Sequence, residues 1–433
     1  ALLALNNLLR SEAKGYSLES LYGKVPPAIK GYVELVYDLN DNPSFRLVEQ
    51  LLYNSSFYCR DAQSLMLSEI SRDDRPFVLS TPRLESANVV HLPISFDDEV
   101  VDKIFRMKNH PQRIGDILGR VDLGNKMSLF EGMFTTDPPP PYESYSGSGV
   151  RWRYFGHACI LIETHGSSIL LDPVLSYTYE SEVSRYTYED LPPQIDYVLI
   201  THNHQDHILF ETLLQIRHKV RNIVVPRSAG GTLQDPSLRL ILQNVGFPNV
   251  IELGELETLK GDGFEITGIP FFGEHADLDI RTKLGYFIRT PSHTLLFAAD
   301  SCNVEPSLYE HLSRDLGQID VLFVGMECDG APLTWLYGPL LTRSIERAAD
   351  QSRRLAGSNC EQAINIVDRF KCKEVYVYAM GQEPWLNYIM SIKYTEQSRP
   401  VIESNRLIQE CRSRGMIAER LFGEKEILTP RSL

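Results

Sequence analysis

Three histidines and an aspartate stand close together near the middle of the chain, in the segment YVLITHNHQDHILF (residues 197–210). His202 and His204 directly follow an apolar run typical of a buried strand, and residues two apart on an extended chain point to the same side. Asp206 and His207 come next, where the chain turns, so they can face a neighbouring second position. Imidazole and carboxylate groups are common protein ligands of zinc and iron. The pattern predicts a site for two metal ions rather than a histidine-rich loop without a ligand.

The elements that must position these side chains are strands, most of them apolar on both faces, with helices between them. Such strands are typical of packed sheets that are covered by helices. Helices are expected around residues 209–219 and 359–370. Strands are expected within residues 159–164, 169–175, 195–201, 221–226, 264–272, 283–290, 293–300, 320–326 and 374–381.

A proline-rich segment divides the chain. TTDPPPPYESYSGSG (135–149) has four consecutive prolines followed by serine and glycine, which predicts a connector that is first stiff and then flexible. We expect an N-terminal mixed α/β domain at 1–134 and a catalytic domain at 150–433. Within the first, residues 31–39 alternate like a strand, whereas 44–71 and 97–121 carry apolar residues at helical spacing.

The HxHxDH pattern of residues 202–207 resembles the metallo-β-lactamase superfamily. GHACILIETHGSSILLDP (156–173) looks like the opening hairpin of that fold, with Asp172 in the place of its supporting aspartate. His157, in the same hairpin, is expected to have a turn or supporting role rather than to bind metal. The resemblance covers roughly residues 150–390. It implies an αββα sandwich, with two sheets face to face and a dinuclear metal site at one edge.

Further ligands should follow later strands of such a fold. FFGEHADL (271–278) offers Glu274 and His275 side by side, where hydrolases of the superfamily carry a single histidine. Asp300, at the end of LLFAADS (295–301), matches the bridging aspartate of the family. The hydrolases also place a histidine after a late strand, but this chain has none after His311. Glu383 could replace it, or that metal could be held more openly, and the sequence leaves both alternatives open.

Carboxylates in place of imidazoles favour iron and dioxygen chemistry over zinc hydrolysis. The chain is most similar to the CmlA-type di-iron oxygenase branch, also in GAPLTWLYGPLL (330–341) and MGQEPW (380–385). The resemblance implies that one iron is held by His202, His204 and Glu274. The other would be held by Asp206 and His207, with Asp300 bridging. Glu274 and Asp300 are then also the predicted catalytic residues.

Members of that branch hydroxylate the β-carbon of an aminoacyl group carried as a thioester on a carrier protein of natural-product biosynthesis. The resemblance therefore implies an O2-dependent monooxygenase with two iron ions, a carrier-protein partner and an external electron donor. The N-terminal domain is expected to dock a partner or to form a homodimer. The alternative is a dinuclear zinc hydrolase of a lactone, thioester, amide or phosphodiester, which ligation by His275 instead of Glu274 would favour.

Composition excludes several other classes. The formal net charge of −14 disfavours binding to nucleic-acid phosphates, which requires clustered lysine and arginine. No apolar run reaches the roughly 18 residues of a membrane span. The seven cysteines are scattered without a CxxC pair, so neither a disulfide framework nor a zinc knuckle is indicated. A reducing cytoplasm is the expected setting.

Overall fold

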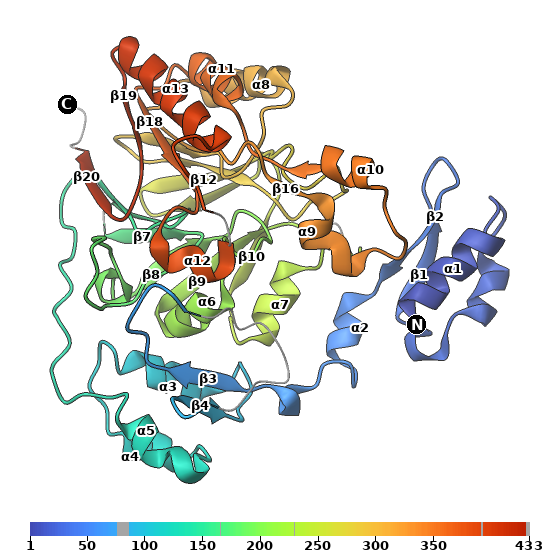
Figure 1. Cartoon of the computed structure of the whole chain (residues 1–433), viewed down its shortest axis with the longest axis horizontal. Helices are drawn as coiled ribbons and strands as arrows, with labels where there is room; N and C mark the ends of the chain where they lie inside the picture. Colours follow the sequence, from blue (N-terminus) through green and yellow to red (C-terminus); the bar gives the residue numbers. More distant parts are fainter. Residues whose placement is uncertain (76–85, 165, 229, 391–392, 430–433) are drawn as a thin grey trace.

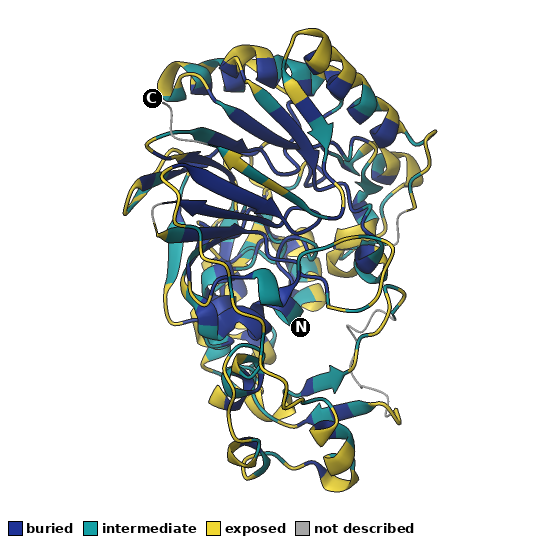
Figure 2. Cartoon of the chain, turned by 90° about the vertical axis from the view of Figure 1, so that its left-hand side faces the viewer, coloured by how far each residue is buried: buried dark blue, intermediate teal, exposed yellow. Residues whose placement is uncertain are grey.

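The computed structural model describes residues 1–75, 86–164, 166–228, 230–390 and 393–429, and its centre is a pair of sheets packed face to face (Figures 1 and 2). Each sheet has seven strands within these ranges. The first runs β10 (Val250–Leu253), β9 (Val220–Pro226), β8 (Ile195–Leu199), β7 (Ser167–Leu171), β6 (Ile160–Thr164), β5 (Val150–Tyr154) and β20 (Lys425–Thr429). The second runs β11 (Thr258–Gly261), β12 (Phe264–Ile269), β13 (Gly285–Arg289), β14 (Thr294–Phe297), β15 (Val321–Gly325), β18 (Glu374–Tyr378) and β19 (Ile417–Arg420).

Aromatic and aliphatic side chains fill the space between the sheets, and most of the strands around it are buried (dark blue in Figure 2). Trp152 of β5 is fully buried there, with ring centroids 5.1 Å from Phe323 and 4.8 Å from Tyr376 in edge-to-face contacts. Because both faces of these sheets are covered, their strands are apolar on both sides. Each of the nine strand ranges expected from the sequence contains a strand.

Helices cover the outer faces and complete an αββα sandwich, as the sequence predicted (Figure 1). The second sheet packs against α8 (Pro306–Leu316), α11 (Cys360–Phe370) and α13 (Arg399–Ser413). The first packs against α6 (Phe210–Ile216) and α7 (Leu238–Asn244). Shorter elements follow late strands: β16 (Ala331–Pro332), α9 (Leu333–Tyr337), α10 (Arg347–Ser352), β17 (Arg354–Leu355) and α12 (Asn387–Met390). No helix of the described residues is long and apolar enough to cross a membrane.

The N-terminal region has two parts with separate cores. The first contains α1 (Leu2–Glu12) and the β1–β2 hairpin (Val33–Tyr37 and Pro43–Leu47), which bury their own apolar cluster and project from the body (Figure 1). The second contains α2 (Glu49–Tyr53), β3 (Leu65–Ser68), β4 (Val89–Leu92), α3 (Glu99–Arg106), α4 (Gly115–Leu118) and α5 (Met127–Glu131). The part from β3 to α5 shares one hydrophobic core with the first sheet and α6.

The helical spacing expected over 44–71 was wrong for most of that range. Its beginning lies in β2 and its end in β3, and only α2 is α-helical between them. The β1–β2 and β3–β4 pairings, both antiparallel, hold these segments extended. Short 3-10 helices complete the chain: η1 (Glu19–Lys24), η2 (Pro27–Ile29), η3 (Arg60–Ala62), η4 (Gly124–Lys126), η5 (Tyr188–Asp190), η6 (Arg217–Lys219), η7 (Gly338–Leu340) and η8 (Pro384–Leu386).

The connector at 135–149 lies against the catalytic part of the chain. Tyr142 donates a hydrogen bond to Glu163 (2.5 Å), and the guanidinium of Arg153 donates to the Tyr142 hydroxyl (2.8 Å). Arg151 donates to the backbone carbonyl of Glu143 (2.8 Å). These contacts fix the middle of the connector, although its composition predicts flexibility after the prolines.

Candidate metal centre

The HxHxDH segment begins where β8 ends at the edge of the first sheet. Thr201 donates its backbone N–H to Asp172 (2.7 Å), which holds the end of this strand against the neighbouring β7. Beyond it the chain turns, and the N–H groups of His207 and Ile208 donate to the carbonyl of His204 at 3.0 and 2.9 Å. The turn places all three histidines of the motif at one end of the sheet, as the spacing predicted.

His202, His204 and Glu274 form the first group of possible metal ligands. All three are buried, with one potential ligand atom from each lying within 4.8 Å of the others. His204 Nδ1 lies 2.8 Å from Glu274 Oε1, and His202 Nε2 lies 3.9 Å from Glu274 Oε2. Glu274 therefore faces both histidines from the loop after β12.

His207, Asp206 and Asp300 lie beside the first group. His207 Nε2 is 3.0 Å from Asp300 Oδ2 and 3.9 Å from Asp206 Oδ2. Asp300 also forms a possible ligand group with His202 and His207, so it lies between the two halves of the site. Two metal-competent groups thus adjoin, with one carboxylate between them.

His157 completes this second group, which the sequence did not lead us to expect. Its Nε2 lies 3.1 Å from Asp206 Oδ2, its ring centroid is 4.9 Å from that of His207, and it is 1% exposed. Among the described residues, His157, Asp206 and His207 make up this second group, and Asp300 belongs to a ligand group with His202 and His207, between the two halves. The sequence signal was its place in the opening hairpin, but only the fold shows that this hairpin ends beside the HxHxDH turn.

Asp172 orients His207 from behind, as its place in the hairpin predicted. Its Oδ2 accepts from Thr201 Oγ1 (2.6 Å) and lies 2.8 Å from His207 Nδ1. With Nδ1 engaged, the Nε2 atom of His207 faces Asp300 and Asp206. Metal-binding histidines are commonly fixed by a carboxylate on the other ring nitrogen in this way.

The structure also shows where His275 and Glu383, the two alternative metal ligands considered from the sequence, lie relative to these groups. His275 lies outside the three groups: its Nδ1 is 2.9 Å from Glu274 Oε2, and its ring stacks on His204 at 4.6 Å. Glu383 is also outside them, since its carboxylate accepts a hydrogen bond from the buried hydroxyl of Tyr154. Among the described residues, His157 rather than Glu383 lies where an additional ligand could act.

Three aromatic residues that follow late strands, Trp335, Tyr337 and Trp385, lie in different environments. Tyr337 is buried in α9, with its hydroxyl 3.3 Å from His204 Nε2, so it borders the first group. Trp335 of the same helix is 66% exposed. Trp385 packs against Gly156 and is 4% exposed, so it belongs to the core.

Strained backbone is concentrated at the site. Positive φ angles occur at His157 (52°), Asp172 (36°) and Glu274 (65°). Ala299, which precedes Asp300, has a φ angle of 48°. Such conformations cost of order 1–3 kcal/mol each for residues with a side chain and persist where the surrounding structure imposes them. Here they turn functional side chains inward from the ends of strands.

The electrostatics of the site suit cations. Burial alone would raise the pKa of Glu274, but His204 and His275 outweigh it and lower that pKa to about 2. Burial and the neighbouring imidazoles lower the pKa of His202 well below its usual value. Both groups therefore have the protonation state that a metal ligand requires.

Unsatisfied atoms provide a second indication. His202 Nε2 and Asp300 Oδ1 are buried without a hydrogen-bond partner in the described part of the chain. A buried polar atom left in this state costs about 1–3 kcal/mol. Both atoms belong to the possible ligand groups, where a bound cation would satisfy them, so the residues fit a pair of metal ions.

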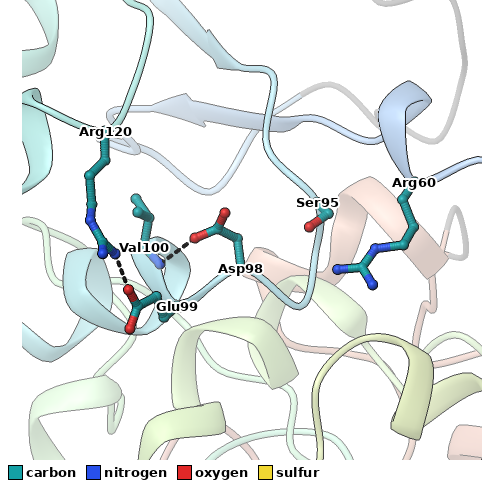
Figure 3. Close-up of a pocket in the computed structure, with 6 residues that line it drawn as sticks. All are labelled: Arg60, Ser95, Asp98, Glu99, Val100 and Arg120. Carbon is teal, nitrogen blue, oxygen red and sulfur yellow. Dashed lines mark hydrogen bonds and ion pairs between the residues drawn. The ribbon is translucent and has the colours of Figure 1, made fainter.

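The hollow shown in Figure 3 is a different feature. It lies in the N-terminal region and is lined by Arg60, Ser95, Asp98, Glu99, Val100 and Arg120. Arg120 pairs with Glu99, and the Asp98 side chain accepts from the N–H of Val100 to cap α3. None of the metal-centre residues lines it, so its charges serve local structure.

The fold and the site together define a metallo-β-lactamase-fold protein with a dinuclear metal centre. Residues 1–138 match the diiron non-haem β-hydroxylase N-terminal domain, and residues 167–368 match the β-lactamase superfamily domain. The chain is 40% identical over 415 residues to the 4-amino-L-phenylalanyl-[CmlP-peptidyl-carrier-protein] 3-hydroxylase of Streptomyces venezuelae, covering 94% of this chain and 78% of that protein.

The structure of the present chain is similar to that of CmlA, a diiron β-hydroxylase from Streptomyces venezuelae, with a TM-score of 0.90 and 38% sequence identity. This similarity covers 98% of the present chain and 81% of the CmlA chain. A UPF0173 protein of Pyrococcus abyssi is 44% identical over 172 residues, 40% of this chain and 67% of that protein. The chain belongs to the family of non-haem di-iron β-hydroxylases. It is an O2-dependent di-iron oxygenase, and the zinc-hydrolase alternative is not supported.

Proposed function

We propose that this enzyme hydroxylates the β-carbon of an aminoacyl group that is carried as a thioester on a peptidyl carrier protein. The similar 3-hydroxylase of S. venezuelae acts on a substrate of this kind, and the similarity extends over 94% of the present chain. The observation that carries the proposal is the inclusion of Glu274 with His202 and His204 in one buried ligand group. A carboxylate in this position suits iron and dioxygen better than a set of histidines alone.

We assign His202, His204 and Glu274 to one iron. We assign Asp206, His207 and His157 to the other, and Asp300, between the two groups, to both. This assignment adds His157 to the set expected from the sequence and leaves His275 and Glu383 as supporting residues. The support comes from the distances within each group and from the unsatisfied atoms of His202 and Asp300.

When bound, the two irons supply the activation of dioxygen that inserts one oxygen atom into a C–H bond. The protein supplies position and environment. Asp172 holds the His207 ring through Nδ1, and the Tyr337 hydroxyl faces the Nε2 of His204, so each imidazole presents its other nitrogen inward. The ligand side chains are mostly buried, which limits the access of water to the reacting groups.

The balance of the reaction requires a further partner. One oxygen atom enters the product and the other leaves as water, which consumes two protons and two electrons. The sequence has no flavin or nicotinamide fingerprint, so we propose an external electron donor. We further propose that 1–134 and 150–433 act as docking and catalytic domains around the 135–149 connector, with homodimerisation as a second role of the first, in a reducing cytoplasm.

The test combines metal analysis with product analysis. Protein handled without oxygen should contain about two irons per chain and show the spectrum of a coupled pair. After chemical reduction, exposure to 18O2 should transfer one labelled oxygen atom to the β-carbon of a carrier-bound amino acid. Two zincs without a redox-active signal, or a hydrolysed thioester without oxygen incorporation, would refute the proposal.

A further inference from the structure

We propose that the carrier protein docks on the outer surface of α9 and the residues that follow it, which we call the α9 face. This inference rests on the proposed function and adds the place where the partner binds. The α9 face consists of Trp335, Leu336, Leu340, Leu341, Arg343 and Arg347. Figure 1 shows α9 and α10 on the side of the body that faces the projecting α1 and β1–β2 unit.

The exposure of apolar side chains distinguishes this face. Trp335 is 66% exposed, whereas the other tryptophans, Trp152 and Trp385, are almost fully buried. Leu336, Leu340 and Leu341 are each more than a third exposed. Large apolar groups gathered within seven residues at the surface mark a protein interaction site, and tryptophan is the residue type most enriched among binding hot spots.

The opposite side of the same helix reaches the metal centre. Leu333 and Tyr337 are buried against Ala276 and Ile280, which follow Glu274 in its loop. The Tyr337 hydroxyl lies 3.3 Å from His204 Nε2. Residues in a helix rise about 1.5 Å each, so the exposed Trp335 and the Tyr337 hydroxyl that faces His204 belong to neighbouring positions of one helix. The α9 face and the first metal group therefore lie on opposite sides of one short helix.

Charge supports a carrier protein as the occupant. Arg343 and Arg347 are exposed and make no ion pair with the described residues, although the chain as a whole carries a net charge of −14. The carboxylate of Asp350, a buried residue of α10, accepts instead from the backbone N–H and the hydroxyl of Thr334 (2.8 Å each) at the start of α9. A carrier protein presents its thioester on a phosphodiester-linked arm, and guanidinium groups bind phosphate oxygens in bidentate geometry.

A second copy of this chain suits the face less well. A two-fold dimer through the α9 face would place the same patch on both sides, so the interface would contain the unpaired arginines of both copies and no added acid to balance them. The N-terminal unit borders the face, because Asn6 in α1 donates to the Thr342 hydroxyl (2.9 Å). A partner seated here would therefore touch both the catalytic part and the N-terminal unit.

The experiment compares two substrates that share one amino acid. The CmlP peptidyl carrier protein charged with 4-amino-L-phenylalanine tests docking, and the pantetheine thioester of the same amino acid does not. The variant is Arg343→Glu/Arg347→Glu, with Trp335→Ala as a second, uncharged change. The matched control is Arg72→Glu/Arg113→Glu, which alters the net charge equally at two exposed arginines without ion pairs in the described structure.

We expect both α9-face variants to lower kcat/KM for the carrier-bound substrate, relative to that for the thioester, by at least tenfold, mainly through KM. The control should keep the wild-type ratio. An unchanged ratio in the α9-face variants, or an equal loss on both substrates, would overturn the docking site. A wild-type enzyme that turns over the thioester but not the charged carrier would overturn the docking site and the carrier substrate together, and one that oxidises neither would refute the proposed function itself.

Discussion

Replacement of His157 by alanine tests the least expected part of the metal centre. In our assignment the second iron has four protein ligands, His157, Asp206, His207 and the shared Asp300, of which the variant removes one. Structural zinc sites with four protein ligands bind their metal with about 10–16 kcal/mol, and the same scale gives about 2.5–4 kcal/mol for each ligand. At 1.4 kcal/mol for each factor of ten, the variant should bind its second iron about 60 to 700 times more weakly.

The assay is iron content after dialysis against a graded series of chelator concentrations. The wild type should retain about two irons per chain, and His157→Ala about one, with loss of the spectrum of the coupled pair. His218→Ala is the matched control, because His218 contacts the Tyr188 hydroxyl (3.0 Å) away from the metal centre. Retention of two irons by His157→Ala at wild-type chelator concentrations, in protein that melts normally, would show that His157 only supports the site.

Further predictions follow from other contacts. Tyr337→Phe removes the hydroxyl that faces His204 Nε2 and should weaken iron binding at the first site about 10–100-fold, the usual effect of losing an outer contact of a ligand, as measured by chelator competition. Burial lowers the pKa of Lys219 from 10.5 to about 7. Between these pH values the unfolded chain binds more protons than the folded chain, so the free energy of unfolding rises with pH. The destabilisation caused by burying Lys219 is therefore greatest below pH 7 and disappears as the pH approaches 10.5. Lys219→Met should therefore raise the free energy of unfolding by about 1–4 kcal/mol at pH 6 and by much less at pH 10, in urea titrations at the two pH values; an equal gain at both would contradict the reasoning. Arg217→Ala leaves Asp102 without its buried partner (2.9 Å) and should cost about 3–5 kcal/mol in the same titration, whereas a loss below 1 kcal/mol would mean that the N-terminal region is held mainly by apolar contacts.

The separate cores of the N-terminal region decide which truncation tests a docking role. Removal of residues 1–135 would expose the core that β3, β4 and α3 share with the first sheet. Removal of residues 1–47 takes away α1, η1, η2 and the β1–β2 hairpin, which have their own apolar cluster. The shorter deletion is therefore the appropriate test of a docking role.

The sequence alone determined the features that depend on local pattern. Strands that are apolar on both faces specified a sandwich of covered sheets, and every range predicted from them contains a strand. The HxHxDH spacing specified a two-metal site because the alternation of an extended chain and the following turn are local properties. Asp300 could be selected as a candidate as well, and so could the pair of Glu274 and His275, since each position directly follows a recognisable strand of a known family.

Tertiary structure decided what depends on distant parts of the chain. The helical spacing of residues 44–71 gave way to the pairing of β2 and β3 with other strands, because cross-strand contacts outweigh weak local propensity. His157 and Asp206 are far apart in sequence, and only the packing of the first sheet brings their side chains to 3.1 Å. The choice between Glu274 and His275, adjacent in sequence, depends on which side chain the positive φ angle at residue 274 turns toward His204, and no local pattern contains that information.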